Sequence, residues 1–167
     1  VRRHSFPTRR SSDLKNIHMN PLCELKIALA SDHAGYQLKQ TIIEHLQQAG
    51  VTVYDFGCYS QESCDYPDFA HAMAEAVVKE TYSFGIAICS TGNGITMTAN
   101  HHTGIRAALC WDVPLALLAR QHNNANVLGL PANFVSPVLA LEIVDAFLST
   151  DFEGGRHLRR INKIDVC

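Results

Sequence analysis

The sequence predicts an α/β fold in which a parallel sheet of five strands is covered by helices on both faces. Two observations lead to this prediction. Short apolar segments rich in Ile, Val, Leu and Ala alternate with longer segments in which apolar residues recur every three or four positions. The short segments are apolar on nearly every residue, which is typical of strands buried on both faces of a parallel sheet.

The first strand is predicted over 25–31, where LKIALAS is short and apolar. A helix is predicted over 36–49, because apolar residues recur there at helical spacing and Gly50 follows as a stop signal. The segment VTVYDFG, residues 51–57, is predicted to be the second strand.

A polar loop, CYSQESCDYP, leads to a helix predicted over 67–80, and Pro67 suits the first turn of that helix. The third strand is FGIAICS, residues 84–90. A short helix over 95–100 precedes the fourth strand, GIRAALCW, at 104–111.

A helix over 114–122 leads to the fifth strand, ANVLGLP, at 125–131. Ser136 then supplies a hydroxyl N-cap for the next helix. The segment RHLRRINKI, residues 156–164, is predicted to be a basic C-terminal helix. Because no repeat or linker interrupts this order, residues 19–167 are predicted to form a single domain.

Composition and charge exclude several classes of protein. The chain has 167 residues, 47% of them hydrophobic, which suits one domain with a substantial core. A net charge of −2 predicts neither a nucleic acid nor a membrane surface as partner. The six cysteines form no C-x-x-C pair, which indicates reduced thiols and a cytoplasmic location. The nine histidines show no spacing typical of zinc ligands, so no metal site is predicted.

Residues 1–18 differ from the rest of the chain. They are basic, polar and without periodicity, and they lack the apolar region of a signal peptide. The segment SFPTRRSSDL can also be back-translated to a common sequencing-adapter string. We therefore expect a non-native or disordered leader, with the natural start near Met19; a genuine basic tail is the alternative.

The stretch CSTGNG, Cys89 to Gly94, carries the most specific chemistry. A glycine loop that enters a helix presents backbone N–H groups, and the helix N-terminus adds partial positive charge. A thiol beside this loop lies in a field that stabilises the thiolate, so Cys89 is a candidate base. A plain structural turn beside an inert core cysteine is the alternative.

Other candidates lie at element ends. Asp32 and His33 follow the first strand, where they could orient or move a proton, although Asp32 could equally serve as a helix N-cap. His122 lies at a helix end, where a C-cap role is the alternative. Arg156 and Arg160 share one helical face and suit a phosphate monoester, although a solvated charged face would show the same spacing.

Six segments in this order resemble the signature segments of type B ribose-5-phosphate isomerases, a family that includes allose-6-phosphate and galactose-6-phosphate isomerases. The resemblance runs from about Leu25 to Ile164, and the segments are SDHAGYQLK, DYPDFA, ICSTGNGITMTAN, GIRAALC, RQHNNANVL and EGGRHLRRI. It implies a Rossmann-like three-layer fold, a phosphorylated sugar as substrate and no metal or cofactor. It also implies a homodimer or dimer of dimers, with sites shared across the interface.

The resemblance further implies roles for single residues. Cys89 takes the C2 proton, the loop Ser90–Gly94 stabilises the enediolate oxygen, and His122 assists ring opening with Asp32 nearby. Within that loop Thr91 is assigned with the catalytic residues, and the other loop residues with substrate binding. The remaining positions are implied to contact the substrate or its phosphate: His33, Tyr66, Ser90, Gly92, Asn93, Gly94, Asn123, Arg156 and Arg160.

Two positions depart from the family pattern. Ser90 stands where many members have glycine, and Asn133 stands where members usually have an arginine that helps to hold the phosphate. The leading hypothesis is an enzyme that interconverts ribose 5-phosphate and ribulose 5-phosphate. A hexose-6-phosphate isomerase and a non-catalytic sugar-phosphate-binding subunit are the alternatives, and a thiol redox sensor is a weaker one.

Removing residues 1–18 should change neither stability nor rate, because their composition cannot build a core. A chain starting at Met19 should match the full chain in melting temperature and turnover. Thermal unfolding of both chains checks this, and a drop of many degrees on truncation would contradict it.

Overall fold

The structure is a computed structural model that describes residues 21–79 and 81–166. The expected leader, residues 1–18, and the expected start at Met19 lie outside the described residues. The strands are β1 (Lys26–Ser31), β2 (Thr52–Asp55), β3 (Phe84–Cys89), β4 (Ala107–Leu109) and β5 (Val127–Pro131). The helices are η1 (Pro21–Glu24), α1 (Tyr36–Gln48), α2 (Tyr66–Val78), α3 (Asn93–Asn100), α4 (Val113–Asn123), α5 (Pro137–Ser149) and α6 (Arg156–Ile161).

All five strands are parallel and lie in the order β2-β1-β3-β5-β4, which confirms the predicted sheet. In the centre of the sheet Leu29 pairs with Ile86, and Ile86 pairs with Leu128. These three side chains have no exposed surface. Their burial on both faces explains why the central strands are apolar on every residue.

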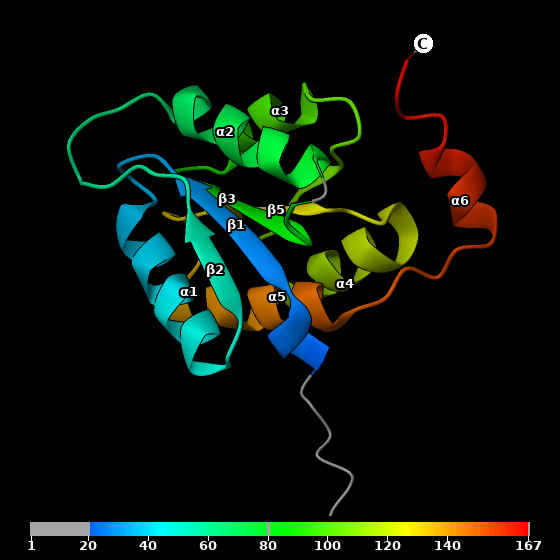
Figure 1. The fold of residues 1–167 in the computed structure, drawn as a ribbon, viewed down its shortest axis with the longest axis horizontal. Helices are drawn as coiled ribbons and strands as arrows, with labels where there is room; N and C mark the ends of the chain where they lie inside the picture. The colour runs from blue at the N-terminus through cyan, green and yellow to red at the C-terminus, as the bar shows by residue number, and fades with distance from the viewer. Residues whose placement is uncertain (1–20, 80, 167) are drawn as a thin grey trace, which may run out of the picture.

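Helices cover both faces of the sheet, as predicted. Helices α2 and α3 pack on one face, and α1, α4 and α5 pack on the other, as Figure 1 shows. Each face has its own apolar core. The core between the sheet and α2 and α3 is rich in alanine, which lets these two helices lie close to the strands that carry the site.

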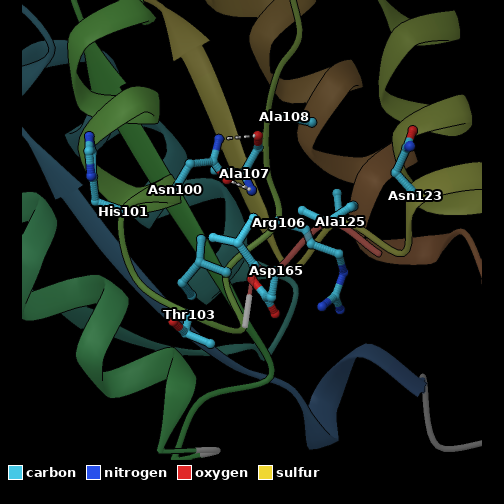
Figure 2. A pocket seen from close by; sticks show the side chains of 12 residues that line it. Asn100, His101, Thr103, Arg106, Ala107, Ala108, Asn123, Ala125 and Asp165 are labelled. Carbon is cyan, nitrogen blue, oxygen red and sulfur yellow. Dashed lines mark hydrogen bonds between the residues drawn. The ribbon is translucent and has the colours of Figure 1, made fainter. Parts of the chain in front are cut away.

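Several predicted boundaries shift. Helix α3 begins at Asn93 rather than 95, because Gly92 has a φ of 73° and turns the chain directly into the helix. Strand β4 has three residues rather than eight, and a side chain pairs with its first residue on the free edge of the sheet. Asn100 donates to the carbonyl of Ala107 at 2.9 Å and accepts its N–H at 2.8 Å (Figure 2). Such pairing protects an edge strand from other chains.

The strand order creates a switch point between β1 and β3. From β1 the chain continues to β2 on one side, whereas β3 and the later strands lie on the other side. In parallel α/β sheets, ligands bind in the crevice outside the carboxyl ends of the strands at such a point.

Lys39 is an unexpected part of the core. It lies on α1 with no exposed surface, although a lysine is almost never fully buried unless it is paired. Its Nζ lies 2.5 Å from Oδ1 of Asp55 and 2.5 Å from the carbonyl oxygen of Cys58. Oδ1 of Asp55 also accepts the N–H of Gly57 at 2.9 Å. One buried ammonium group therefore ties α1 to the end of β2 and to the loop beyond it.

Replacing Asp55 should destabilise the protein far more than replacing Lys39. Asp55→Ala leaves a buried ammonium without its carboxylate, which costs about 3 kcal/mol, the lower end of the range for a broken buried pair. Lys39→Met should cost about 1 kcal/mol, because Asp55 is 26% exposed and keeps water as a partner. Urea unfolding of both variants measures this order.

Glu75→Ala is the matched control, because Glu75 pairs with Lys79 at 3.8 Å on the surface of α2. An exposed pair of this kind contributes less than about 0.5 kcal/mol. Equal losses for Asp55→Ala and Glu75→Ala would contradict the structural role of Lys39.

Candidate functional site

The switch point brings two predicted segments together. The N–H of Asp32, just after β1, donates to the carbonyl oxygen of Ile88 in β3 at 3.1 Å. Gly35 lies against the same strand, and a Cβ there would be 2.6 Å from the oxygen of Ile88. Only glycine therefore lets the chain enter α1 this close to β3. The segments after β1 and β3 therefore lie side by side at the switch point, where a ligand crevice is expected in a sheet of this kind.

Asp32 is 7% exposed, and its Oδ1 accepts the N–H of Gly35 at 3.0 Å. The N-cap of α1 is Gly35, so the alternative in which Asp32 is the N-cap residue is wrong. The carboxylate instead closes the turn that leads into α1. A carboxylate fixed in this way lies just beyond the carboxyl end of β1, next to His33 in the chain.

His33 has a defined tautomer when its ring is neutral. The backbone N–H of Cys64 can only donate, and it lies 3.3 Å from Nδ1 of His33. Nδ1 is therefore the acceptor, and the ring hydrogen lies on Nε2, which can donate to an oxygen of a ligand. The sequence had not singled out Cys64 as the partner of His33. Burial raises the pKa of the Cys64 thiol, and the hydrogen bond that this thiol donates to Cys58 raises it further.

Cys89 is the last residue of β3 and is 4% exposed. Its side chain belongs to the apolar core beneath α2 and α3, which it shares with Met73 and with Ile95 of the first turn of α3. The thiol is thus held in an apolar environment directly beside the loop that starts α3.

The loop after Cys89 has the geometry of an anion cradle. The first turn of a helix has N–H groups without carbonyl partners inside the helix, and these groups carry partial positive charge. In α3 this turn includes Asn93, Gly94 and Ile95. The hydroxyl of Thr91 accepts the N–H of Asn93 at 3.3 Å, which leaves the next two amides available for a ligand.

Tyr66 covers this loop from α2. A Cβ on Gly94 would lie 2.4 Å from Cζ and 2.7 Å from the hydroxyl oxygen of Tyr66. The ring therefore packs directly against Gly94. Tyr66 is also the first residue of α2, which begins one residue before the predicted start at Pro67.

Ser90 and Asn133, the two departures from the family pattern, are bonded to each other. Nδ2 of Asn133 donates to Oγ of Ser90 at 2.8 Å, and the backbone N–H of Asn133 donates to the carbonyl oxygen of Ser90 at 3.0 Å. Nothing in the sequence pairs these positions, which lie 43 residues apart.

The other predicted residues lie elsewhere in the chain. Helix α4 starts after the carboxyl end of β4 and runs back, so that His122 and Asn123 reach the amino ends of the strands. Helix α6, with Arg156 and Arg160, packs against α4. Figure 1 shows α6 on the side of the molecule opposite the loop between β2 and α2. A single chain therefore does not bring these four residues to Cys89.

A second cluster forms at this amino edge. The rings of His122 and His157 are stacked 4.2 Å apart with an angle of 11°, and Nε2 of each ring lies within 3.9 Å of Oε2 of Glu153. Burial lowers the pKa of His157, and the charges of His122 and Arg156 lower it further. The sequence had not singled out His157 or Glu153, although both lie in the segment EGGRHLRRI.

The geometry of the cluster does not favour a metal ion. The ligand atoms of His122, Glu153 and His157 all lie within 4.8 Å of one another, which is close enough for a metal site. The nearly parallel rings, however, direct their Nε2 lone pairs side by side rather than toward one point. The charges of Arg156 and Arg160 also disfavour a cation here.

Two cavities lie near the predicted residues. One, of about 520 Å³, is at the amino edge, and its lining includes Asn123, Arg106 and Asp165 of the C-terminal segment (Figure 2). The other, of about 470 Å³, lies on the outer side of the loop that contains Thr91 and Asn93. Its walls include Trp111 and Phe134, which are more than half exposed. None of the helices in the described parts of the chain is long and apolar enough to cross a membrane.

Comparison with known proteins gives consistent matches. The model of the ribose/galactose isomerase family matches residues 27–164. The ribose-5-phosphate isomerase B of Escherichia coli K12 is 46% identical over 139 residues, which are 83% of this chain and 93% of that protein.

Solved structures give the same result. A ribose 5-phosphate isomerase from Thermotoga maritima is 51% identical, with a TM-score of 0.84 over 85% of this chain and 98% of that one. The ribose-5-phosphate isomerase B of Mycoplasma genitalium with bound ribulose-5-phosphate is 48% identical, with a TM-score of 0.81 over 84% of this chain and 94% of that one.

Proposed function

The chain belongs to the ribose/galactose isomerase family, and on this basis we propose that it interconverts ribose 5-phosphate and ribulose 5-phosphate. The observation that carries the proposal is the thiol of Cys89 beside the loop amides at the switch point. An aldose–ketose conversion needs a base for a carbon-bound proton and donors for the oxygen that becomes anionic. This crevice offers both.

The reaction needs only proton transfers. The Cys89 thiolate removes the proton from C2 of the open-chain aldose, and the electron pair of that bond moves through C1 onto O1 to give an enediolate. The amides of Gly94 and Ile95 stabilise the charge on the oxygen, an interaction typically worth a few kcal/mol per donor. The proton then returns to C1, and the hydroxyl proton of O2 moves to O1 as C2 becomes the carbonyl. Neither a metal nor a cofactor is required.

The neighbouring side chains bind and orient the sugar. Nε2 of His33 donates to the phosphate or to a hydroxyl, and Tyr66 closes the crevice over the loop. Thr91 holds the loop amides in place through its bond to Asn93. Asp32 accepts hydrogen bonds from the sugar and helps to orient His122 of a neighbouring subunit.

The remaining residues come from a second copy of the chain. His122 and Asn123, with Arg156 and Arg160, lie at the other edge of the sheet from Cys89. A two-fold dimer that places the amino edge of one copy over the carboxyl edge of the other completes two equal sites. His122 then assists ring opening, and the two arginines bind the phosphate.

We propose the cytoplasm as the location and pentose phosphate metabolism as the context. Cys58, Cys64, Cys89 and Cys110 are free thiols, and free thiols persist in a reducing compartment. A panel of ribose, allose and galactose phosphates tests the substrate. Turnover of a hexose phosphate alone would favour the hexose-phosphate branch of the family.

Cys89→Ala should abolish isomerisation, a loss of at least about a thousandfold in kcat, because it removes the group that takes the C2 proton in the proposed mechanism. Folding and ribose 5-phosphate binding should persist, since alanine fits the same apolar core. A coupled assay measures turnover, and calorimetry measures binding.

Cys110→Ala is the matched control. Cys110 is as buried as Cys89 but lies in the core of the opposite face, and burial raises the pKa of its thiol to about 12. This variant should keep most of its activity. Turnover by Cys89→Ala close to that of Cys110→Ala would disprove the thiol base.

Mixing two inactive chains should restore activity if the site is shared. One chain carries Cys89→Ala, and the other carries Arg156→Ala with Arg160→Ala. A mixed dimer has one site with all the substitutions and one intact site. With equal amounts of the two chains, random exchange makes about half of the dimers mixed, so about a quarter of the wild-type activity should return.

The control mixes Cys89→Ala with a chain that carries all three substitutions, a pair in which every site lacks Cys89. Copurification of differently tagged chains verifies that subunits exchange. Exchange without recovery of activity would show that the site lies within one chain.

A further inference from the structure

Two loops that lead away from neighbouring strands are joined beside Cys89. Strand β3 pairs with β5, and the pairing continues past both strands: the N–H of Ala132 donates to Cys89, and the N–H of Asn133 donates to Ser90. The side chains add a third bond, from Nδ2 of Asn133 to Oγ of Ser90 at 2.8 Å. The backbone bonds already hold the two loops together. The side-chain bond is therefore not needed for that purpose, and its main effect is to orient the Ser90 hydroxyl group.

The direction follows from a count of donors and acceptors. The amide nitrogen of Asn133 can only donate, so Oγ of Ser90 is the acceptor in this bond. The hydroxyl keeps one hydrogen of its own, and no described residue accepts that hydrogen. Ser90 is half-buried and directly follows Cys89, so its hydroxyl hydrogen remains available next to the proposed base.

We propose that Asn133 is a positioning residue, which holds the Ser90 hydroxyl so that its hydrogen is donated to an oxygen of the bound sugar phosphate. This inference rests on the proposed isomerase function and assigns to that site a donor pair, Ser90 and Asn133. Asparagine suits the task because its amide offers a hydrogen-bond donor without a charge. An aspartate of the same shape would accept instead, and would draw the Ser90 hydrogen away from the ligand.

The test is a double-mutant cycle of Ser90→Ala and Asn133→Ala. Each single variant should lower kcat/KM about fivefold, the value expected for one partly exposed hydrogen bond. The double variant should also lose about fivefold rather than twenty-five-fold, because the amide acts only through the hydroxyl. Ser90→Thr, which keeps a hydroxyl, should recover most of the loss seen in Ser90→Ala. The melting temperature should change little, since the two backbone bonds remain in every variant.

Asn133→Asp supplies a second measurement. It should lower kcat/KM more than Asn133→Ala when Ser90 is present, and the excess should shrink when residue 90 is alanine. An effect of Asn133→Asp that is equal in both backgrounds would reflect the repulsion of the phosphate alone and would overturn the proposal. Additive losses in the alanine cycle would overturn it as well.

Calorimetric binding of ribose 5-phosphate separates this inference from the proposed function. If the wild-type chain binds the sugar phosphate without turnover, the proposed isomerase function is wrong. The double-mutant cycle can then be evaluated with dissociation constants in place of kcat/KM. If the wild-type chain turns over and the cycle is additive, the function stands and the role of Asn133 fails.

Discussion

The buried ammonium group of Lys39 is the interaction on which the arrangement of the site depends. It holds Asp55 at the end of β2 and the carbonyl of Cys58 in the following loop. That loop then places the N–H of Cys64 on His33 and delivers Tyr66, at the start of α2, onto Gly94. A long polar loop has little apolar surface of its own to bury, so a charged anchor inside the fold compensates for the entropy of ordering it. The geometry of the site thus depends on a lysine that is buried in the core of the fold.

The sequence was a good guide to the elements and to one half of the site. Buried parallel strands are apolar throughout, and their carboxyl ends share one edge, so Asp32, His33 and Cys89 could be placed together in advance. The role of Lys39 could not be predicted, because a lysine on an amphipathic helix is normally solvated and its partner lies 16 residues away. The bond between Ser90 and Asn133 could not be predicted either, since it depends on the meeting of two loops 43 residues apart. Contacts of this kind follow from tertiary packing, which local patterns do not contain.

The division of the predicted site between two edges has a simple topological origin. A helix that connects parallel strands runs antiparallel to them, so residues at its C-terminus reach the amino ends of the sheet. His122 ends α4, and α6 packs beside it. The residues that the family resemblance assigns to one site therefore lie at opposite edges of the sheet within one chain. The order of strands and helices in the sequence already predicts this separation. The proposed dimer brings the two sets of residues together across its interface.

The division also separates the two arginines of a chain from the Cys89 thiol of the same chain. The carboxyl edge carries the thiol of Cys89, backbone amides, a hydroxyl, an imidazole and the carboxylate of Asp32. The amino edge carries Arg156, Arg160 and the two stacked histidines with Glu153. In the proposed dimer the phosphate dianion occupies the cationic edge of one copy, and the enediolate forms over the amides of the other. The arginines then interact with the phosphate, whose charge is the same before and during the reaction. The amides interact with the enediolate oxygen, whose charge develops only during the reaction. Only the second interaction is stronger in the transition state than in the bound substrate, so it is the one that accelerates the reaction.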